Sequence, residues 1–193
     1  MKIAIIDYGA GNIQSIKFAI KRLGFEAVLT NDEDEIKAAD KVIFPGVGEA
    51  SSAMKMLRNS KLDTLIPKLT QPVLGICLGM QLMCAHSEEG DTTGLSIFEV
   101  PVLKFNNSLK VPQIGWNQIT NLSTPIFSEI KELEYVYLVH SYYVAECDET
   151  IATSEYGVKY STALKKDNFY GVQFHPEKSS DAGEKILKNF LEL

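Results

Sequence analysis

Val73-Leu74-Gly75-Ile76-Cys77-Leu78-Gly79 joins a short apolar run, which we predict to be a buried strand, to a segment of helical periodicity. A Gly-x-Cys-x-Gly pattern at such a junction is typical of a nucleophile on a tight, strained turn, because the glycines remove side chains that would clash there. The N–H groups that begin the helix would favour the thiolate, the reactive form of cysteine. A lone cysteine is more often a plain core residue, but the paired glycines favour a nucleophile at Cys77.

The segments before this junction alternate between apolar runs and helical periodicity. We predict strands at residues 2–6, 27–29 and 41–44, and helices at residues 13–23, after the acidic run 32–35, and at 50–57. Gly24 supplies a C-cap signal for the first helix. Continuous apolar strands that alternate with helices predict a parallel sheet with helices on both of its faces.

The pattern changes from about residue 95, where strand-like segments follow one another with turns between them. We predict strands at residues 95–105, 111–119, 135–144, 151–156, 161–165 and 169–174, and a closing amphipathic helix at residues 182–191. This spacing favours antiparallel additions to the parallel sheet. The sequence has no internal repeat, low-complexity tract or linker, so we predict one α/β domain that covers residues 1–193.

The composition argues against several classes of protein. A net charge of −6 at pH 7 disfavours a nucleic-acid partner, which normally requires a basic face. The three cysteines, Cys77, Cys84 and Cys147, have no CxxC spacing, so we expect no disulfide framework, metal or other cofactor. The sequence has neither a signal-peptide pattern nor an apolar run of about 20 residues, and we therefore expect no membrane segment and a reducing, cytoplasmic location.

A thiolate that attacks an amide needs a base, and the sequence has three histidines. His175 lies in Gln173-Phe174-His175-Pro176-Glu177, at the end of a predicted strand, where residues two apart point the same way. Glu177 is therefore placed to orient the imidazole, as in nucleophile–base–orienter triads. His140 is a rival base without a carboxylate within two residues, and we expect His86 to be exposed after a helix. A purely structural role for His175 stays open from these residues alone.

Pro45-Gly46-Val47-Gly48 follows the predicted strand at residues 41–44. Open parallel sheets place ligands beyond the carboxyl ends of their strands, so we expect this loop and Cys77 to share one crevice. The glycines leave backbone N–H groups free to approach a developing oxyanion, and one such donor is worth ~3 kcal/mol in a transition state. An ordinary glycine-rich turn is the alternative interpretation.

These three motifs, in this order, resemble those of the class I (triad-type) glutamine amidotransferases. That family carries an oxyanion loop Pro-Gly-x-Gly, an elbow Gly-x-Cys-x-Gly-x-Gln and a late His-Pro-Glu, which stand here at residues 45–48, 75–81 and 175–177. The resemblance implies a flavodoxin-like fold, with Cys77 as nucleophile, His175 as general base and then acid, and Glu177 as its orienter. It also implies an oxyanion hole made by Gly46, Val47, Gly48 and Leu78. It further implies contacts to the substrate glutamine from Gln81, Glu89, Ser141 and Tyr142.

Within this family the chain is similar to the glutaminase subunits of imidazole glycerol phosphate synthases, which act in histidine biosynthesis. The similarity spans nearly the whole chain and includes residues 7–12 with Ser15, 75–81, 115–117, 140–143 and 175–179. It implies a heterodimer in which ammonia passes to a (β/α)₈ cyclase subunit that forms imidazole glycerol phosphate and an aminoimidazole ribonucleotide. It further implies that the glutaminase idles until partner and acceptor ligand are bound. The implied partner interface contains Asn12, Trp116, Tyr137 and Lys178.

Other functions stay open at this stage. The segment 112–117, Pro-Gln-Ile-Gly-Trp-Asn, departs from the family's common Pro-His-Met-Gly-Trp-Asn, so an amidotransferase for a different acceptor synthase is an alternative. A cysteine hydrolase of peptide or γ-glutamyl bonds and a catalytically silent regulatory subunit are two more. A nucleotide binder is the weakest, because the glycine loop after the first strand has Gln14 where the dinucleotide fingerprint requires glycine.

Overall fold

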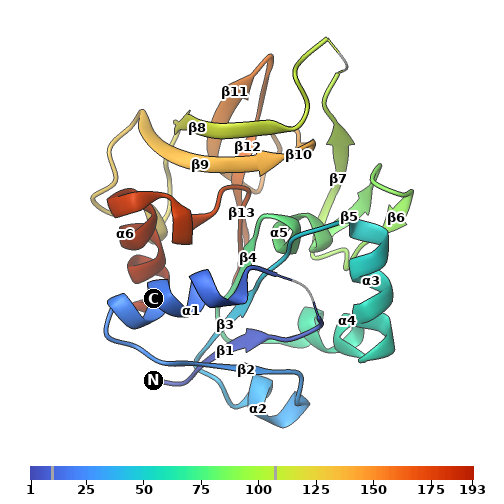
Figure 1. Cartoon of the computed structure of the whole chain (residues 1–193), viewed down its shortest axis with the longest axis vertical. Helices are drawn as coiled ribbons and strands as arrows, with labels where there is room; N and C mark the ends of the chain where they lie inside the picture. The colour runs from blue at the N-terminus through green and yellow to red at the C-terminus, as the bar shows by residue number, and fades with distance from the viewer. Residues whose placement is uncertain (10, 107) are drawn as a thin grey trace.

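A computed structural model describes residues 1–9, 11–106 and 108–193 of the chain (Figure 1). The first half alternates strands with helices: β1 (Ile3–Ile6), α1 (Ile13–Arg22), β2 (Ala27–Thr30), α2 (Glu33–Lys37), β3 (Lys41–Phe44), α3 (Ala50–Asn59), α4 (Leu62–Leu65), β4 (Val73–Ile76) and α5 (Leu78–Leu82). The predicted strands and helices of this half are confirmed to within a few residues, whereas α4 was not predicted. Ala10, which belongs to the motif at residues 7–12, lies outside the described residues.

The second half consists mainly of strands. It contains β5 (Cys84–Ser87), β6 (Thr92–Thr93), β7 (Phe98–Lys104), β8 (Gln113–Ile119), β9 (Glu134–His140), β10 (Tyr142–Val144), β11 (Thr150–Tyr156), β12 (Val158–Lys166), β13 (Phe169–Val172) and the closing helix α6 (Ser180–Leu191). Short 3₁₀ turns occur at Ile66–Lys68, Pro125–Phe127 and Pro176–Lys178.

Within the described residues, eleven strands form one sheet in the order β2-β1-β3-β4-β13-β12-β10-β7-β5-β6, with β11 paired to β12. The first five strands are parallel, and their order is that of a flavodoxin-like sheet. β12, β10 and β7 continue the sheet by antiparallel pairing. The predicted parallel sheet with antiparallel additions is confirmed. Its register opposes Ile76 of β4 with Val172 of β13, so the residues after these strands lie side by side.

Alternate side chains of the central strands enter two separate cores. Ala4 and Ile6 of β1 pack with α3 and α4, whereas Ile3 and Ile5 pack with α1 and α6. Figure 1 shows these two helix pairs on opposite sides of the sheet. Each strand is therefore buried on both faces, which is why its sequence is continuously apolar.

The prediction of a single strand at residues 135–144 is wrong. The strand is interrupted at Ser141, because β9 pairs with β8 in a separate antiparallel ribbon whereas β10 pairs with β7 in the main sheet. The carbonyl of Ser141 accepts a hydrogen bond from the Phe105 N–H at 3.1 Å. His86 follows α5 and its side chain is 43% exposed, as expected, although it lies in the unpredicted strand β5.

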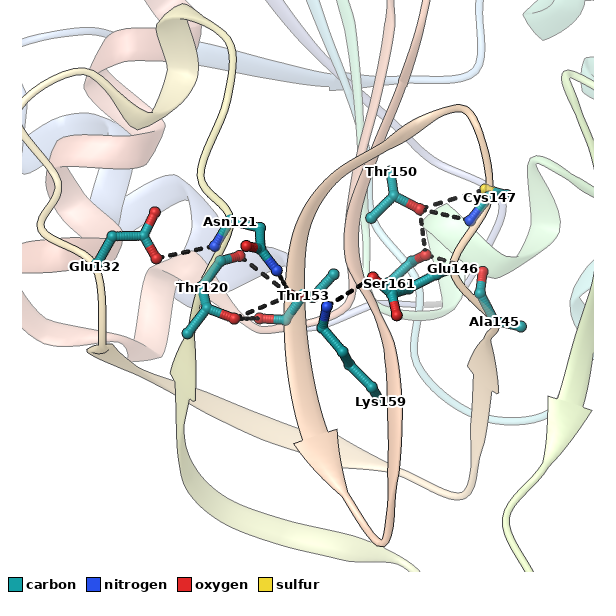
Figure 2. Close-up of polar contacts among 10 residues, drawn as sticks. All are labelled: Thr120, Asn121, Glu132, Ala145, Glu146, Cys147, Thr150, Thr153, Lys159 and Ser161. Atoms are coloured by element: carbon teal, nitrogen blue, oxygen red, sulfur yellow. Dashed lines mark hydrogen bonds and ion pairs between the residues drawn. The ribbon is translucent and has the colours of Figure 1, made fainter.

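Polar side chains fasten the β11–β12 hairpin to its neighbours (Figure 2). The hydroxyls of Thr120 and Thr153 lie 3.0 Å apart, and Asn121 Nδ2 donates to the Thr153 hydroxyl at 2.8 Å. Ser161 of β12 donates to the Ala145 carbonyl at 2.9 Å, just after β10. Because Thr120 and Asn121 directly follow β8, these bonds hold the β8–β9 ribbon against the main sheet.

Among the described helices, none combines the length and the hydropathy that crossing a bilayer requires.

Candidate active site

Cys77 stands on the turn between β4 and α5. Its backbone has φ +53° and ψ −111°, a strained conformation for a residue other than glycine, and its N–H donates to the Val172 carbonyl at 2.8 Å. The predicted strained elbow is therefore confirmed. The turn lifts the side chain beyond the carboxyl end of the parallel sheet, where such folds place their ligands.

Two glycines, Gly46 and Gly79, bring the elbow and the Pro45–Gly48 loop into backbone contact. A Cβ on Gly79 would lie 2.0 Å from the Phe44 carbonyl oxygen, and one on Gly46 would lie 2.4 Å from the Gly79 nitrogen. Within the elbow, a Cβ on Gly75 would lie 2.9 Å from the Met80 nitrogen of α5. The loop can therefore reach the elbow only with glycine at positions 46 and 79, and glycine at position 75 lets β4 pack against α5.

His175 joins Cys77 to Glu177. Its Nδ1 lies 2.9 Å from Glu177 Oε1, which leaves Nε2 free to interact with Cys77. The His175 and Glu177 side chains are 6% and 1% exposed. Burial opposes a charge on the ring, but the hydrogen bonds and charges of Cys77 and Glu177 outweigh it and raise the pKa of His175 to about 10. The arrangement therefore favours the protonated, imidazolium form of His175.

The contact between His175 and Glu177 forms by a different route from the predicted one. We expected both residues in one extended segment, but β13 ends at Val172 and residues 176–178 form a 3₁₀ turn that His175 precedes. Pro176 occupies the first position of this turn, where its fixed φ suits a helical start. The predicted pair is confirmed, and the predicted backbone is wrong.

His140 lies close by but has other partners. Its Nδ1 lies 2.7 Å from the Tyr142 carbonyl oxygen, so it carries the proton, and Nε2 lies 3.4 Å from the Tyr160 hydroxyl. Burial lowers the pKa of His140 to about 4, and the charge on His175 adds to this effect. A neutral ring without a carboxylate fits a structural role better than that of the base.

Acidification is expected to destabilise the fold through His140. Between pH 6.5 and about 4 the unfolded chain binds a proton at this residue that the folded chain does not. The free energy of unfolding should therefore decrease as the pH is lowered, by up to roughly 3 kcal/mol over this range. His140→Asn keeps an N–H donor for the Tyr142 carbonyl and should remove this part of the pH dependence. Urea unfolding of both proteins at pH 7 and pH 5 measures the effect, and equal pH dependence would contradict it.

A cleft of about 340 Å³ opens above the cysteine. Its lining includes most of the site residues that the sequence suggested, namely Val47, Gly48, Cys77, Leu78, Gln81, Glu89, Ser141, Tyr142, His175 and Lys178. Pro112, Val139 and His140 complete it. Gly46 does not line the cleft, since it packs under the loop against Gly79.

Gln81 and Glu89 also make contacts within the protein. Gln81 Nε2 donates to the Tyr142 carbonyl at 3.1 Å and to Gln173 Oε1 at 2.8 Å. Glu89 Oε2 accepts from the Ala50 N–H, at the start of α3, at 2.8 Å. Burial raises the pKa of Glu89, and its N–H contact lowers it less. Both side chains are thus held in fixed positions at the cleft.

The sequence patterns gave no role to Tyr8 and Gln173. Tyr8 is buried and donates its hydroxyl to the Pro45 carbonyl at 2.8 Å, which anchors the base of the glycine loop. Burial and then the charge of Cys77 raise the pKa of Tyr8 far above its ordinary value. Tyr8 lies two residues after β1 and Gln173 lies directly after β13, and the shared carboxyl edge of the sheet is the signal that would have found them.

The suggested interface residues fall into two places. Trp116 is 53% exposed, its ring centre lies 5.9 Å from that of Tyr137, and Lys178 Nζ lies 6.0 Å from the Tyr137 ring. These three residues form one group on the β8–β9 ribbon and the turn after His175. Asn12 immediately precedes α1 and is partly buried.

The chain matches the family described as Glutamine amidotransferase class-I over residues 4–193. A Bacteroides fragilis protein named imidazole glycerol phosphate synthase subunit HisH is 56% identical, over 100% of both chains. A Pectobacterium atrosepticum protein of the same name is 46% identical, with the same coverage. A chain of PurLQS from Thermotoga maritima superposes with a TM-score of 0.75 at 17% identity, over 99% of this chain and 97% of that one, a likeness of fold. The chain therefore belongs to the class-I glutamine amidotransferase family.

Proposed function

We propose that the chain is the glutaminase subunit of an imidazole glycerol phosphate synthase, which hydrolyses L-glutamine and passes the ammonia to a cyclase subunit. The observation that carries the hydrolysis is the Cys77–His175–Glu177 arrangement beside the cleft. The choice of acceptor is supported by the relatives named above, which match over the full length of both chains.

In the proposed reaction the Cys77 thiolate attacks the side-chain carbonyl carbon of glutamine, and the carbonyl oxygen takes up the negative charge. His175, protonated and oriented by Glu177, gives its proton to the amide nitrogen, so the carbon–nitrogen bond breaks and ammonia leaves. The neutral ring then takes a proton from the water that attacks the thioester. Glutamate is released, and the thiolate and imidazolium are restored.

The oxyanion hole is assigned to backbone N–H groups of residues 46–48 and of Leu78. Gly48 has φ +100°, and a Cβ added there would meet nothing within 4 Å, so the peptide has room to turn toward the cleft. Gly46 contributes mainly by letting the loop lie against α5. Leu78 lines the cleft directly after the nucleophile, where its N–H is the second donor.

The amino-acid end of the substrate is assigned to Gln81, Glu89, Ser141 and Tyr142, which line the same cleft. The Glu89 carboxylate has the charge that complements an α-ammonium group. The backbone of Ser141 and Tyr142 supplies hydrogen-bonding groups in the same cleft. The Gln81 amide fixes this backbone by its hydrogen bond to the Tyr142 carbonyl. These four residues position the side-chain amide over Cys77.

The cyclase subunit is proposed to dock on the β8–β9 ribbon. Large apolar side chains are exposed there, with Ile114 at 63%, Trp116 at 53% and Tyr135 at 51%. Exposed apolar patches of this kind mark protein interfaces, and aromatic residues dominate their binding energy. Lys178 lies both in the cleft and over the Tyr137 ring, so this interface adjoins the site where ammonia forms. Asn12 extends the proposed interface to the start of α1.

A docked acceptor explains why ammonia need not enter the solvent. Ammonia in neutral water is mostly ammonium, which is not a nucleophile, and direct transfer avoids this loss. The proposed location is the cytoplasm, where reducing conditions keep a catalytic thiol available.

A nitrogen-transfer assay tests this function. With the cyclase subunit and its ribonucleotide acceptor, the chain is expected to support product formation from glutamine, whereas the cyclase alone should need added ammonium salt. Failure to transfer nitrogen from glutamine, or transfer only to a different synthase, would overturn the assignment. Covalent labelling of Cys77 by a glutamine-analogue electrophile separates an active subunit from a catalytically silent one.

A further inference from the structure

Gln173 is a buried polar residue that the proposed mechanism does not use. It follows β13 directly, is 0% exposed, and its backbone N–H donates to the Thr162 carbonyl at 2.8 Å. A buried side-chain amide costs free energy unless its groups are hydrogen-bonded. Because β13 pairs in parallel with β4, this side chain emerges beside Cys77.

The direction of the Gln173 amide follows from its neighbours. The Tyr142 carbonyl is only an acceptor, so Gln81 must present its NH₂ group there, at 3.1 Å. The same NH₂ group lies 2.8 Å from Gln173, which must therefore present its Oε1 to Gln81. The remaining NH₂ group of Gln173 faces the Cys77 sulfur at 3.7 Å. A flip of either amide would oppose two acceptors or two donors.

We infer that Gln173 is a catalytic residue whose side-chain N–H holds the Cys77 sulfur as an anion in the position for attack, with Gln81 fixing the direction of its amide. This role rests on the proposed nucleophilic function of Cys77.

The surroundings of the sulfur explain what this donor adds. The thiol also lies 3.8 Å from the Val139 carbonyl oxygen, an acceptor that favours the protonated thiol. A donor that favours the charged form counteracts this contact, and a neutral amide does so without adding a charge to the site. His175 gives up its proton during the reaction, whereas the Gln173 amide keeps its N–H and can hold the departing thiolate throughout.

Gln173→Met keeps the length of the side chain but removes the donor. The midpoint pH for alkylation of Cys77 by iodoacetamide is expected to rise by about one unit, which is a tenfold loss of thiolate below the midpoint. Peptide-resolved mass spectrometry separates Cys77 from Cys84 and Cys147. For glutamine hydrolysis, kcat should fall by about tenfold and KM by much less, since the substrate contacts remain.

Two further variants make the test specific. Gln173→Glu keeps the shape and replaces the donor with an anion, so its midpoint should rise more than that of Gln173→Met. Gln113→Met is the matched control, because Gln113 is also a buried glutamine but accepts from the Tyr160 hydroxyl at 3.1 Å. The midpoint pH for alkylation of Cys77 should not change in this variant.

Unchanged alkylation midpoints in both Gln173 variants, with native circular dichroism spectra, would overturn the role of Gln173. Glutamine turnover by the wild type would in that case leave the proposed function intact. Conversely, a shifted midpoint in a chain that never hydrolyses glutamine would support the contact and reject the proposed function.

Discussion

Replacing Cys77 with alanine is expected to lower the rate of glutamine hydrolysis by roughly 10⁴-fold or more, because the residues of a nucleophile–base–orienter triad act as a unit. The variant has no atom that can form the thioester, and His175 and Glu177 cannot replace it. Steady-state release of glutamate, measured in the presence of the cyclase subunit so that the wild-type rate is high, gives the ratio.

Cys147→Ser is the matched control for this variant. Cys147 is also a free thiol, but it lies near Thr150 at the start of β11, with 3.5 Å between the sulfur and the Thr150 hydroxyl. Serine at this position should keep the wild-type rate. Turnover that survives in Cys77→Ala, or that is lost in Cys147→Ser, would reject Cys77 as the nucleophile.

The second large effect is expected from the partner. The chain alone should hydrolyse glutamine slowly, and the cyclase subunit with its acceptor ligand should accelerate hydrolysis on the order of 100-fold or more, which is the typical value of one oxyanion donor. We attribute this increase to rotation of the peptide at Gly48, where φ is +100° and space is open. Glutamate release by the chain alone, with the cyclase, and with the cyclase plus ligand measures it.

Surface variants locate the origin of this acceleration. Trp116→Ala, at a side chain 53% exposed beside Tyr137, should weaken the stimulation and raise the cyclase concentration that it requires. Val28→Ala, at a side chain 58% exposed on the edge strand β2, should leave it unchanged. Equal hydrolysis rates with and without the partner would exclude this form of gating.

The amino-acid sequence by itself determined the parallel half of the fold and the elbow that carries Cys77. Strands buried on both faces have continuous apolar sequences, and the helices between them have a clear period, so β1, β3, β4 and α1 are readable from local pattern. Gly75 and Gly79 were readable for a similar reason, because a residue that leaves no space for a Cβ must be glycine. Their spacing around Cys77 is a local pattern, although the Phe44 carbonyl that crowds Gly79 lies far from it in the sequence.

Only the tertiary structure decided which groups surround the sulfur. His140 and His175 were both candidate bases, and the choice depends on a Glu177 contact made through a 3₁₀ turn and on a Tyr142 carbonyl that occupies His140. The interruption between β9 and β10 at Ser141 could not be predicted, because the sequence pattern does not show that the two strands pair in different sheets. Gln173 acquires its direction only through Gln81, 92 positions away. Local patterns encode burial and backbone shape, whereas hydrogen-bond partners far apart in the chain are chosen by the packed fold.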